Sequence, residues 1–598
     1  MGALAISAPA GAAPASETVQ RMLLAAPHRG GELRIDTVGR AAFGVCNDPE
    51  LRDAWLGRAN GRIAAFAGSL DNLSDLAVEL GRGSRRPLDD ANPAEVVLAA
   101  FAAWGDSAPA HFRGVFSGAV ADDERVWCFR DHLGFKPFFY REDARGFFAA
   151  TEAKQVVAGA GIPREPDLDG IQGILFGGPR KLGIRGVERF PSSSTGSVDR
   201  SGRVRFTGYW DPEKLLETAR LTPAETIERL RELMEQAVSR TVSGNDVVAL
   251  SGGIDSPVVA AFAASRHTEL SGRPLQALSA VFPHLPSVDE LPYIELVRDR
   301  LNIPLETYVP AARPLDRADF WADLLDGPVD TLSIPEVAEI SAHTRRLGAR
   351  RLLTGELFEY VVCMRQHVIA HLILHGRWRS AGRRLAEERA RGFSWSSILR
   401  PHAVALLPPS IATRYVRLRN RDHADLPAWL ERGRVSGLGY RRDLQYPARR
   451  RWLEAQLAPT GRGGSSSTIE ANEICSAYHG IQPRTPLTDI DLWEFCLSLR
   501  AETKFPNRVL KVLVRHAMEG LLPEEILWRK DKTGFDAHVM ATAEWDEIRR
   551  WTIESKHRIA GIDYVALDAR LQSHAMDSFE LGRARDLARA HAFLSLWD

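Results

Sequence analysis

The chain has 598 residues, which exceeds what a single hydrophobic core usually organises, so we expect two or more domains. Its 77 basic and 77 acidic residues balance to a formal net charge of +0, so the overall charge demands no nucleic-acid partner. A hydrophobic content of 44% and a charged content of 26% are typical of an ordinary globular protein.

The cysteines argue against a structural zinc site and against a disulfide framework. They show no C-x-x-C spacing, and they lie scattered at Cys46, Cys128, Cys363, Cys475 and Cys496. No apolar run reaches the length of about 18 residues that a membrane span needs, and no basic segment precedes the short apolar stretch at the start. We therefore expect a reduced cytoplasmic protein with neither a signal peptide nor a membrane span.

Up to about residue 210, short apolar segments alternate with breaks rich in Gly and Asp. This alternation predicts β-hairpins of an antiparallel sheet, with one helix among them at PAEVVLAAFAAW. The segment PSSSTGSVDRSGRVRFTGYWDP is turn-rich, and helical periodicity begins soon after it. We therefore predict an α+β domain over residues 1–210 and a second domain over residues 211–598.

The second domain has a different pattern. Between residues 245 and 355, the strand-like runs DVVALS, LQALSAVF, LETYVP and RRLLTG alternate with helical stretches, which predicts an α/β parallel sheet with helical crossovers. Beyond residue 360 the chain is mostly helical and dense in Arg, Leu and Trp. The domain should thus end in a helical C-terminal part.

The first of these strands runs into SGGIDS, residues 251–256, and then into a helix. A strand that ends in Ser-Gly-Gly and opens a helix is a phosphate site, because glycines let main-chain amides approach and the helix start adds positive charge. The lysine of a P-loop is absent, since Ile254 and Asp255 stand there, and G-x-G-x-x-G is absent too. A carboxylate at Asp255 suits Mg²⁺. The alternative is a plain glycine turn.

The loop resembles the pyrophosphate loop of the ATP pyrophosphatase superfamily, whose members adenylate an acid. Three further segments resemble the synthetase domain of asparagine synthetases, and they read SVDELPYIELVRDRLNI, PRTPLTDIDLWEF and LKVLVRHAMEGLLPEEILWRKDKTGF. This resemblance implies ATP and Mg²⁺ as cofactors, with the nucleotide held by Leu250, Ser251, Gly252, Gly253, Asp255 and Ser256. It also places Ser279 and Val281 at the border of the adenine and ribose, although both could simply pack in a strand.

The N-terminal domain is similar to the glutaminase domain of the same family, which has the sandwich fold of N-terminal-nucleophile enzymes. The matching segments read MLLAAPHRGGE, AAFAGSLDNLSDL and RDHLGFKPFFY. Such glutaminases use a cysteine at position 2 as nucleophile, whereas Gly2 stands here, and Ala67 replaces the asparagine of the oxyanion hole. We therefore expect a degenerate domain that has no glutaminase activity.

Members without this glutaminase take the amine from the substrate itself. The Arg-rich stretch from residue 376 to residue 419 and the overall length resemble the macrocyclases of lasso peptides. This implies a ligase that closes an isopeptide ring in a precursor peptide, with a leader peptidase and a leader-binding protein as pathway partners. A small-molecule amide synthetase, either β-lactam forming or ammonia-using, is the alternative enzyme, and an ATP-binding scaffold is the alternative without catalysis.

The segment LLTGELFEYVV allows two alignments with the family. Without a gap, Glu356 is the acid or base, Glu359 is a second metal ligand beside Asp255, and Gly355 borders the nucleotide; this is the version we favour. With a three-residue deletion, Glu356 matches a later residue and the metal role is in doubt. As plain structure, the two glutamates would form a solvated helix face.

The late segment WRKDKTGF supplies cations for the oxyanion and the leaving phosphate. Lys532 best matches the catalytic lysine of the family, with Lys530 and Arg529 as competitors. Lys511 and Arg515, four residues apart on the preceding helix, could also face the phosphates or could form a salt-bridged helix surface.

Overall fold

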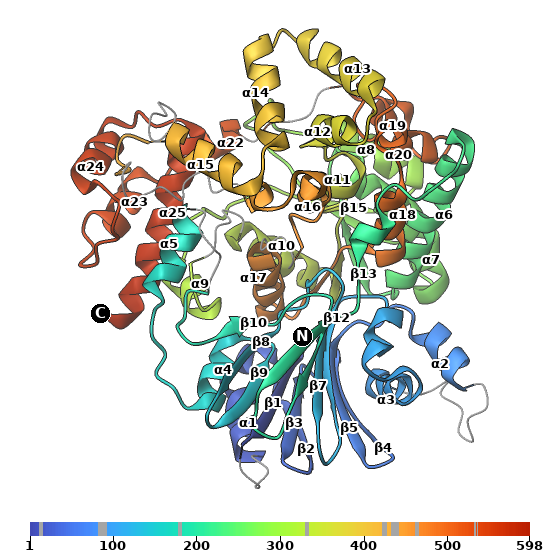
Figure 1. Ribbon diagram of the computed structural model, residues 1–598, viewed down its shortest axis with the longest axis vertical. Helices are drawn as coiled ribbons and strands as arrows, with labels where there is room; N and C mark the ends of the chain where they lie inside the picture. The colour runs from blue at the N-terminus through green and yellow to red at the C-terminus, as the bar shows by residue number, and fades with distance from the viewer. Residues whose placement is uncertain are drawn as a thin grey trace.

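The computed structural model describes residues 1–10, 16–81, 92–176, 182–328, 334–420, 427–431, 442–460, 466–530, 534 and 536–598. In this part of the chain the backbone forms three sheets, two of six strands and one of five. Figure 1 shows the strands of the N-terminal half gathered at the bottom and the helices of the C-terminal half above them. No helix within the described ranges is long and apolar enough to cross a membrane.

The N-terminal half is a sandwich of two antiparallel sheets with helices outside. The strand orders are β10-β8-β9-β1-β3-β2 and β12-β11-β7-β6-β5-β4. Successive side chains of strand β1 point to opposite faces of its sheet. Leu4 and Ile6 join the core between the two sheets, whereas Ala3 and Ala5 join the core under the outer helices. The first sheet contains β1 (Ala3–Pro9), β2 (Glu32–Val38), β3 (Ala41–Asn47), β8 (Phe139–Asp143), β9 (Gly146–Ala150) and β10 (Glu188–Arg189).

The second sheet contains β4 (Ala54–Ala59), β5 (Arg62–Gly68), β6 (Phe116–Ala121), β7 (Val126–Arg130), β11 (Ser194–Val198) and β12 (Val204–Gly208). The helices of this half are α1 (Ser16–Leu24), α2 (Leu73–Gly81), α3 (Pro93–Trp104), α4 (Ala153–Ala160) and α5 (Leu168–Phe176). Helix α3 begins where the sequence predicts, because Asn92 caps it and exchanges hydrogen bonds with Glu95 in a capping box.

Two parts of this half differ from the sequence expectations. The turn-rich segment before residue 210 contains the hairpin β11–β12, whose five residue pairs run from Ser194–Gly208 to Val198–Val204. The Ala-rich start of the chain, whose apolar stretch suggested no particular element, is the inner strand β1, paired with both β3 and β9. Small side chains allow this strand to lie between two packed faces. Strand propensities do not predict it, because they do not describe how a side chain packs against its neighbours.

The C-terminal half contains the five-stranded sheet, and every pair in it is parallel. The strand order is β15-β14-β13-β16-β17, so the chain builds outward from β13 in one direction and then resumes at β16 on its other side. The strands are β13 (Asp246–Ala249), β14 (Gln276–Ala280), β15 (Leu305–Tyr308), β16 (Arg351–Leu353) and β17 (Gln482–Arg484). The four strands expected from the sequence are present, and β17 is an addition.

Helices surround this sheet and make up most of the chain beyond its fourth strand. Those before β16 are α6 (Pro223–Thr241), α7 (Asp255–Ser271), α8 (Leu291–Leu301), α9 (Ala318–Leu324) and α10 (Ile334–Arg346). Those after β16 are α11 (Glu359–Val362), α12 (Val368–Leu374), α13 (Trp378–Arg389), α14 (Trp395–Leu406), α15 (Pro409–Asn420), α16 (Arg451–Gln456), α17 (Ser466–Tyr478), α18 (Ile490–Ser498), α19 (Ala501–Lys504), α20 (Val512–Ala517), α21 (Glu524–Leu527), α22 (Asp536–Ala541), α23 (Trp545–Thr552), α24 (Tyr564–Ser573) and α25 (Ser578–Leu594).

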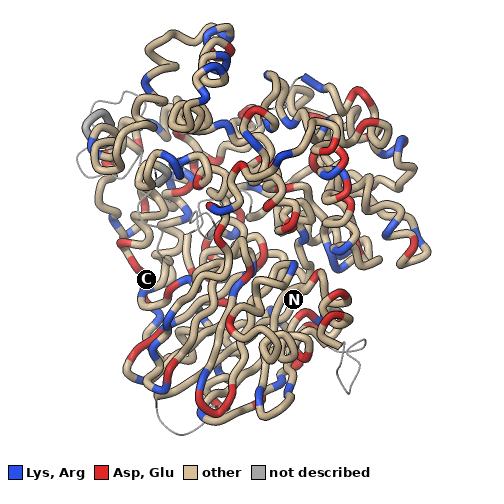
Figure 2. The backbone as a smooth tube through the Cα atoms, turned by 45° about the vertical axis from the view of Figure 1, so that its right-hand side comes forward, with Lys and Arg blue, Asp and Glu red and all other residues tan. Residues whose placement is uncertain are grey.

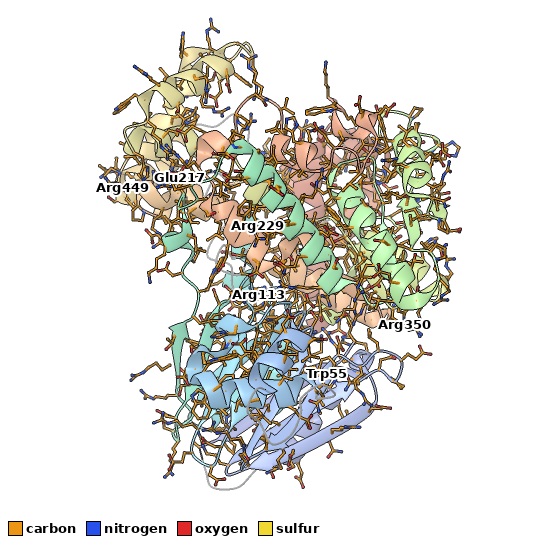
Figure 3. The ribbon with its side chains drawn as sticks, turned by 90° about the vertical axis from the view of Figure 1, so that its right-hand side faces the viewer. Trp55, Arg113, Glu217, Arg229, Arg350 and Arg449 are labelled. Atoms are coloured by element: carbon orange, nitrogen blue, oxygen red, sulfur yellow. The ribbon has the colours of Figure 1, made fainter. Side chains whose placement is uncertain are left out.

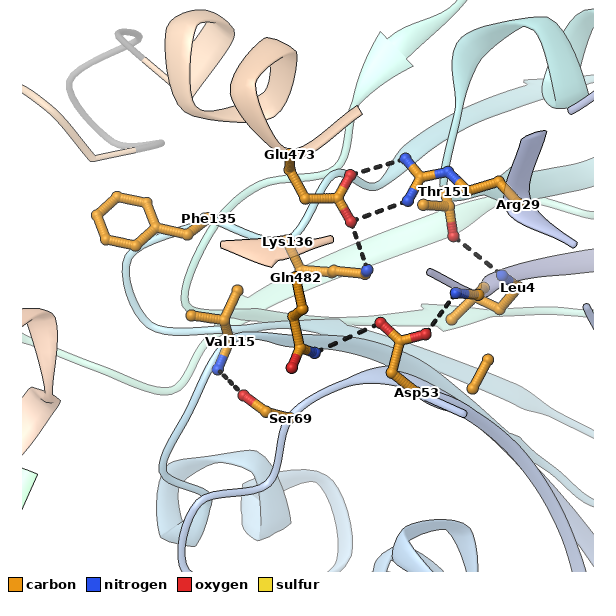
Figure 4. A network of polar contacts seen from close by, with 12 residues as sticks. Leu4, Arg29, Asp53, Ser69, Val115, Phe135, Lys136, Thr151, Glu473 and Gln482 are labelled. Carbon is orange, nitrogen blue, oxygen red and sulfur yellow. Dashed lines mark hydrogen bonds and ion pairs between the residues drawn. The ribbon is translucent and has the colours of Figure 1, made fainter. Parts of the chain in front are cut away.

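Buried charges join the two halves. Glu473 of α17 accepts from both terminal nitrogens of Arg29, at 2.9 and 2.7 Å, and from Lys136 Nζ at 2.6 Å (Figure 4). One helical turn earlier, Glu470 accepts from Arg130 at 2.8 Å and from Arg189 at 2.7 Å. These carboxylates lie against the N-terminal sandwich, so α17 supplies the negative charge that its buried cations require.

A second, more exposed contact crosses the same boundary. Arg113, which Figure 3 labels near the junction of the two halves, donates to Asp491 of α18 at 2.8 Å, and Arg240 of α6 donates to the same carboxylate at 2.8 Å. Because these side chains remain partly exposed, the pair should stabilise the junction less than the Glu473 cluster does.

We expect Glu473→Gln to lower the free energy of unfolding by roughly 3 kcal/mol, because it leaves buried Lys136 without its counter-ion and leaves Arg29 with Glu152 alone. Burial alone would raise the pKa of the Glu473 carboxyl, but the charges of Arg29 and Lys136 outweigh it and hold that pKa at about 2. Since this folded-state pKa lies below the unfolded value of about 4.3, the stabilisation is present above pH 4.3 and is lost as the pH falls toward 2.

Chemical unfolding of the wild type and of Glu473→Gln between pH 7 and pH 3 measures this effect, and the variant should have the flatter curve. The control is Glu232→Ala, which removes the exposed i,i+3 partner of Arg229 and should change the free energy of unfolding by about 0.5 kcal/mol or less. Parallel curves for the wild type and Glu473→Gln would contradict the assignment.

Candidate active site

Two loops meet where the strand order of the parallel sheet reverses. Strands β13 and β16 are neighbours, and their carboxyl ends continue into residues 250–254 and residues 354–358. In open parallel sheets, ligands bind in the crevice at this reversal. A Cβ on Gly355 would lie 2.5 Å from the carbonyl carbon of Asp255, so the two loops touch through their backbones. The fold therefore brings together the two segments that sequence reasoning selected.

The loop after β13 presents backbone amides and hydroxyls at the start of α7. Ser256 Oγ accepts from the Ser251 amide at 2.9 Å and lies 2.9 Å from Ser251 Oγ. Ser251 and Gly253 are exposed, whereas Leu250 is buried under the loop. The amides of Gly253 and Ile254 have no hydrogen-bond partner within the described ranges. Free amides at a helix start are what a phosphate requires.

Glu290 and Arg529, which come from two distant segments, hydrogen-bond to this loop and hold it in place. We call this pair the brace. The Gly252 amide donates to Glu290 at 3.0 Å, and Arg529 donates to the Gly252 carbonyl and to the other oxygen of Glu290, both at 2.8 Å. The Arg529 guanidinium also lies over the ring of Tyr293, 3.9 Å from its centroid. Sequence reasoning treated Arg529 as a competitor for catalysis and did not single out Glu290 or Tyr293. Their only signal was their place in segments that resemble the family.

Asp255 starts α7 and lies beside a cation. Its Oδ2 contacts Lys511 Nζ, while its Oδ1 is buried and has no hydrogen-bond partner among the described residues. A carboxylate oxygen without a partner, next to free amides at a helix start, fits a Mg²⁺ ion that arrives with a triphosphate. The donor set of this loop thus suits the metal expected from the sequence.

The loop after β16 is acidic and strained. Leu357 has a φ of 72°, a left-handed conformation that costs energy for a leucine, and buried Phe358 anchors the loop on the core. Glu356 is exposed to water, yet the protein around it removes enough hydration to raise its carboxyl pKa, and the charge of Glu359 raises it further. A carboxyl whose pKa is raised by its surroundings is a candidate functional group.

Charges from both loops act on the thiol of Cys363. Burial raises the pKa of this thiol, and the charges of Lys511, Asp255 and Glu359 contribute to the shift. Within the described residues no group of three or more His, Cys, Asp or Glu side chains is arranged to hold a metal ion. Whether Glu356 and Glu359 act as base and metal ligand stays a prediction.

The remaining predicted residues lie in different surroundings. Ser279 is buried and donates to the Leu250 carbonyl at 2.6 Å, and Val281 just beyond β14 is nearly buried. Ser279 therefore supports the phosphate loop from the neighbouring strand, and the predicted contact of Ser279 and Val281 with the nucleotide stays a prediction. Lys530 is exposed next to Arg529, and Lys532 lies outside the described residues.

Arg515 faces the same region as Lys511. It donates to the carbonyl of Leu510 at 2.8 Å and to that of Leu527, and burial lowers the pKa of its guanidinium while Asp255 raises it. The ion pair between Lys511 and Asp255 fits either interpretation of this pair, so a phosphate-facing role for Lys511 and Arg515 stays a prediction.

Residues 229–596 match the asparagine synthase family. The chain belongs to this family. Residues 56–158 match a glutamine amidotransferase domain, so the N-terminal sandwich is the amidotransferase part and the parallel-sheet half is the synthase part. At the level of the family, the chain is an asparagine synthetase-like ATP-dependent amide ligase, as the sequence predicts.

The chain is similar to several asparagine synthetases. It is 25% identical to the glutamine-hydrolysing asparagine synthetase 3 of Bacillus subtilis over 508 residues, which cover 80% of this chain and 77% of that protein. It is 23% identical to a putative glutamine-hydrolysing asparagine synthetase of Mycobacterium bovis over 557 residues, 87% of this chain and 82% of the other. The glutamine phosphoribosylpyrophosphate amidotransferase of B. subtilis overlaps 52% of this chain and 83% of its own at 12% identity, with a TM-score of 0.27 that supports no conclusion.

The two glycines of the loop should respond differently to substitution. A Cβ on Gly252 would lie 2.9 to 3.0 Å from Arg529, Glu290 and Tyr293, whereas a Cβ on Gly253 would meet only Ser251 Oγ at 3.6 Å. We expect Gly252→Ala to disrupt the brace and lower the melting temperature by about 2–4 °C, the shift for about 1 kcal/mol. Gly253→Ala should keep the melting temperature and weaken ATP binding, because its methyl group projects on the exposed side.

Thermal unfolding and ATP titration of both variants check this prediction. Equal loss of stability in the two variants would show that the brace does not distinguish these positions.

Proposed function

We propose that the protein is an ATP-dependent ligase that adenylates a side-chain carboxylate of a precursor peptide and closes a macrolactam with the peptide's own N-terminal amine. The observation that carries this proposal is a contrast between the two halves. The phosphate loop keeps its free amides and the Asp255–Lys511 pair, while the position of the glutaminase nucleophile is closed. The amine must then come from a source other than glutamine.

The closed position is Gly2. A Cβ there would lie 2.6 Å from the Cys46 carbonyl and 2.7 Å from both Ala54 and Asn47, so a cysteine side chain does not fit. The guanidinium of Arg29 already has protein partners. Its Nε donates to Glu152, and both of its terminal nitrogens donate to Glu473. These contacts support the proposal that the domain has no glutaminase activity.

In the first step, a carboxylate oxygen of the peptide attacks the α-phosphorus of ATP. A new P–O bond forms, the bond to the β-phosphate breaks, and pyrophosphate leaves. Ser251, Gly252, Gly253 and Ser256 bind the phosphates, and Lys511 and Arg515 supply positive charge. Mg²⁺ held by Asp255, and by Glu359 in the ungapped alignment, would neutralise charge on the phosphates.

In the second step, the peptide's amine attacks the acyl carbon and AMP leaves. Glu356 takes the amine proton, a role that suits a carboxylate whose raised pKa makes it a stronger base. Lys532, or Lys530 beside it, stabilises the oxyanion and the leaving phosphate. The enzyme holds the two ends of the peptide together, and such positioning supplies effective molarities of about 10⁵ to 10⁸ M.

Support for a peptide rather than a small molecule comes from the Arg-rich helices α13–α15, where the sequence resembles lasso peptide macrocyclases. In this pathway a leader peptidase and a leader-binding protein would deliver the precursor, and neither nucleic acid nor a membrane takes part. An amide synthetase for small molecules would instead release pyrophosphate with a free amino acid and not with a peptide.

The direct test is to incubate the protein with ATP, Mg²⁺ and a processed precursor peptide. We expect release of pyrophosphate and a product lighter by one water. Asp255→Asn should lower the rate about 10²-fold or more with little loss of stability, since asparagine keeps the size of this side chain, which is 19% exposed. Asp299→Asn, an exposed acid on α8, serves as control. Pyrophosphate release that requires a free amino acid instead would favour the other enzyme, and none at all would favour a scaffold.

Glu356→Gln should separate the two half-reactions. Exchange of pyrophosphate into ATP with the peptide should persist, while ring closure should slow about 10²- to 10⁴-fold, the usual contribution of a general base. In the wild type, ring closure should rise with pH through an apparent pKa above the ordinary glutamate value of about 4.3, because burial and Glu359 raise that pKa. Glu524→Gln, exposed on α21, is the matched control. Equal losses in both half-reactions would contradict a role as base.

A further inference from the structure

A cluster of arginines borders the candidate active site without belonging to the phosphate loop. Arg365 and Arg384 both lie over the ring of buried Phe505, 5.2 and 5.8 Å from its centroid. The charge of exposed Arg391 also acts on Arg365. One acid, Glu387, accompanies the three, accepting from Arg384 at 2.9 Å. The cluster therefore carries an excess of two positive charges.

These guanidiniums are incompletely bonded. Arg384 is 6% exposed, and its Nη2 has no partner within the described ranges; the same is true of Arg365 Nε. The contacts of Arg365 Nη2 to the carbonyls of residues 507, 508 and 509 are all 3.4 Å, longer than an ordinary hydrogen bond. Burial and the charges of Arg384 and Arg391 lower the pKa of Arg365. A bound anion would accept hydrogen bonds from the unpartnered nitrogens and would offset the repulsion between the arginines.

A structural arginine elsewhere in the chain shows the contrast. Arg451 is fully buried, and its nitrogens donate to five main-chain carbonyls at 2.6 to 3.1 Å. The cluster at Phe505 does not have that arrangement. Its guanidiniums make only long contacts to the neighbouring backbone, as expected for donors that bind a ligand.

The place of the cluster links it to the chemistry. The backbone that Arg365 contacts runs directly into Lys511, which pairs with Asp255. The cluster is therefore linked through residues 507–511 to the ion pair at the start of α7.

The surface next to the cluster is apolar and basic. Val509 and Leu510 are 38% and 47% exposed, and on the segment that carries Arg391 the large side chains Trp378, Phe393 and Trp395 are 65%, 53% and 49% exposed. Figure 2 shows basic positions along this projecting segment at the top of the molecule, which Figure 1 labels α13 and α14. Exposed apolar side chains beside a group of arginines suit a peptide better than an inorganic ion.

We infer that Arg365 and Arg384, which meet over Phe505, form a subsite for a carboxylate of the peptide substrate other than the carboxylate that is adenylated, and that the charge of Arg391 strengthens it. This inference rests on the proposed peptide ligation. Planar guanidiniums match a carboxylate through paired N–H donors, and a second fixed point on the peptide would orient its chain for ring closure. The carboxylate can be an acidic side chain or the C-terminus of the peptide.

Binding of short synthetic peptides to the full-length protein, without ATP, tests the subsite. The probes are acetyl-Gly-Leu-Glu-Gly-Leu-Gly-amide, which has only a side-chain acid, acetyl-Gly-Leu-Gln-Gly-Leu-Gly with a free C-terminal acid, and the neutral Gln peptide amide. We expect one acidic probe to bind about tenfold more tightly than the neutral one, as for a hydrogen bond to a charged group. The probe that does so identifies the source of the carboxylate.

The variants are Arg391→Gln and Arg384→Lys, with Arg383→Gln as the matched control, an exposed neighbour on the same helix. Arg391→Gln and Arg384→Lys should remove most of the acid preference, and Arg383→Gln should keep it. Because Arg391 is exposed, its variant tests the subsite even if the buried Arg384 variant fails to fold. Equal binding of the three probes, equal effects of Arg391→Gln and Arg383→Gln, or displacement of the acidic probe by excess pyrophosphate would overturn the inference.

These outcomes are separable from those of the proposed function. A protein that closes peptide rings but shows no acid preference would refute the subsite alone. A protein that binds the acidic probe through Arg391 yet makes no cyclic product would refute ring closure alone.

Discussion

The contact between the backbone of Gly355 and the first turn of α7 determines the arrangement of the candidate site. Because a Cβ at this glycine would come within 2.5 Å of the Asp255 carbonyl carbon, the loops after β13 and β16 lie as close as two backbones can. That approach brings Glu356 and Glu359 toward Asp255 and concentrates negative charge at the strand reversal. Lys511 and the helix start balance part of this charge, and a divalent cation would balance the rest.

The surrounding braces explain how so charged a loop keeps its shape. Arg529 reaches Gly252 and Glu290 from a segment far along the chain, and Ser279 fixes the carbonyl of Leu250 from the neighbouring strand. Each brace bonds the main chain of the loop on its inner side, so the outward amides stay available. Rigid support behind a set of free donors is the arrangement that electrostatic catalysis needs.

Much of this could be predicted from the sequence, and the remainder could not for physical reasons. Strands β13 to β16 and helix α3 follow from apolar runs and a capping box, and the Gly-Gly of the phosphate loop identifies its own chemistry. Strand β17 was missed because it has three residues with Pro483 in the middle, which an edge strand tolerates and a pattern does not indicate. Similarly, β1 is made of small residues whose fit depends on the two faces around it.

The candidate site was likewise predictable from the sequence only in part. Asp255 was predictable because its role follows from local spacing, whereas the Glu290–Arg529 brace joins residues 239 positions apart, and no local signal encodes that pairing. The arginines at Phe505 also come from separate segments, α13 and the turn before α12. Sequence composition showed that this region is Arg-rich, but only the fold shows which guanidiniums converge.

The pairing of Arg29 with Glu473 spans 444 positions, so it has a consequence for the order in which the chain can fold. While the chain is being synthesised, the amidotransferase sandwich emerges first. Arg29, Lys136 and Arg130 are destined for its interior, and Glu152 within the sandwich can pair with Arg29, but the carboxylates of Glu470 and Glu473 are not yet made. Burying those cations early is unfavourable, so the sandwich must remain loosely packed on that face until α17 emerges. Completion of the N-terminal half is thereby delayed until most of the synthase half exists, which makes folding of the two halves a single late event.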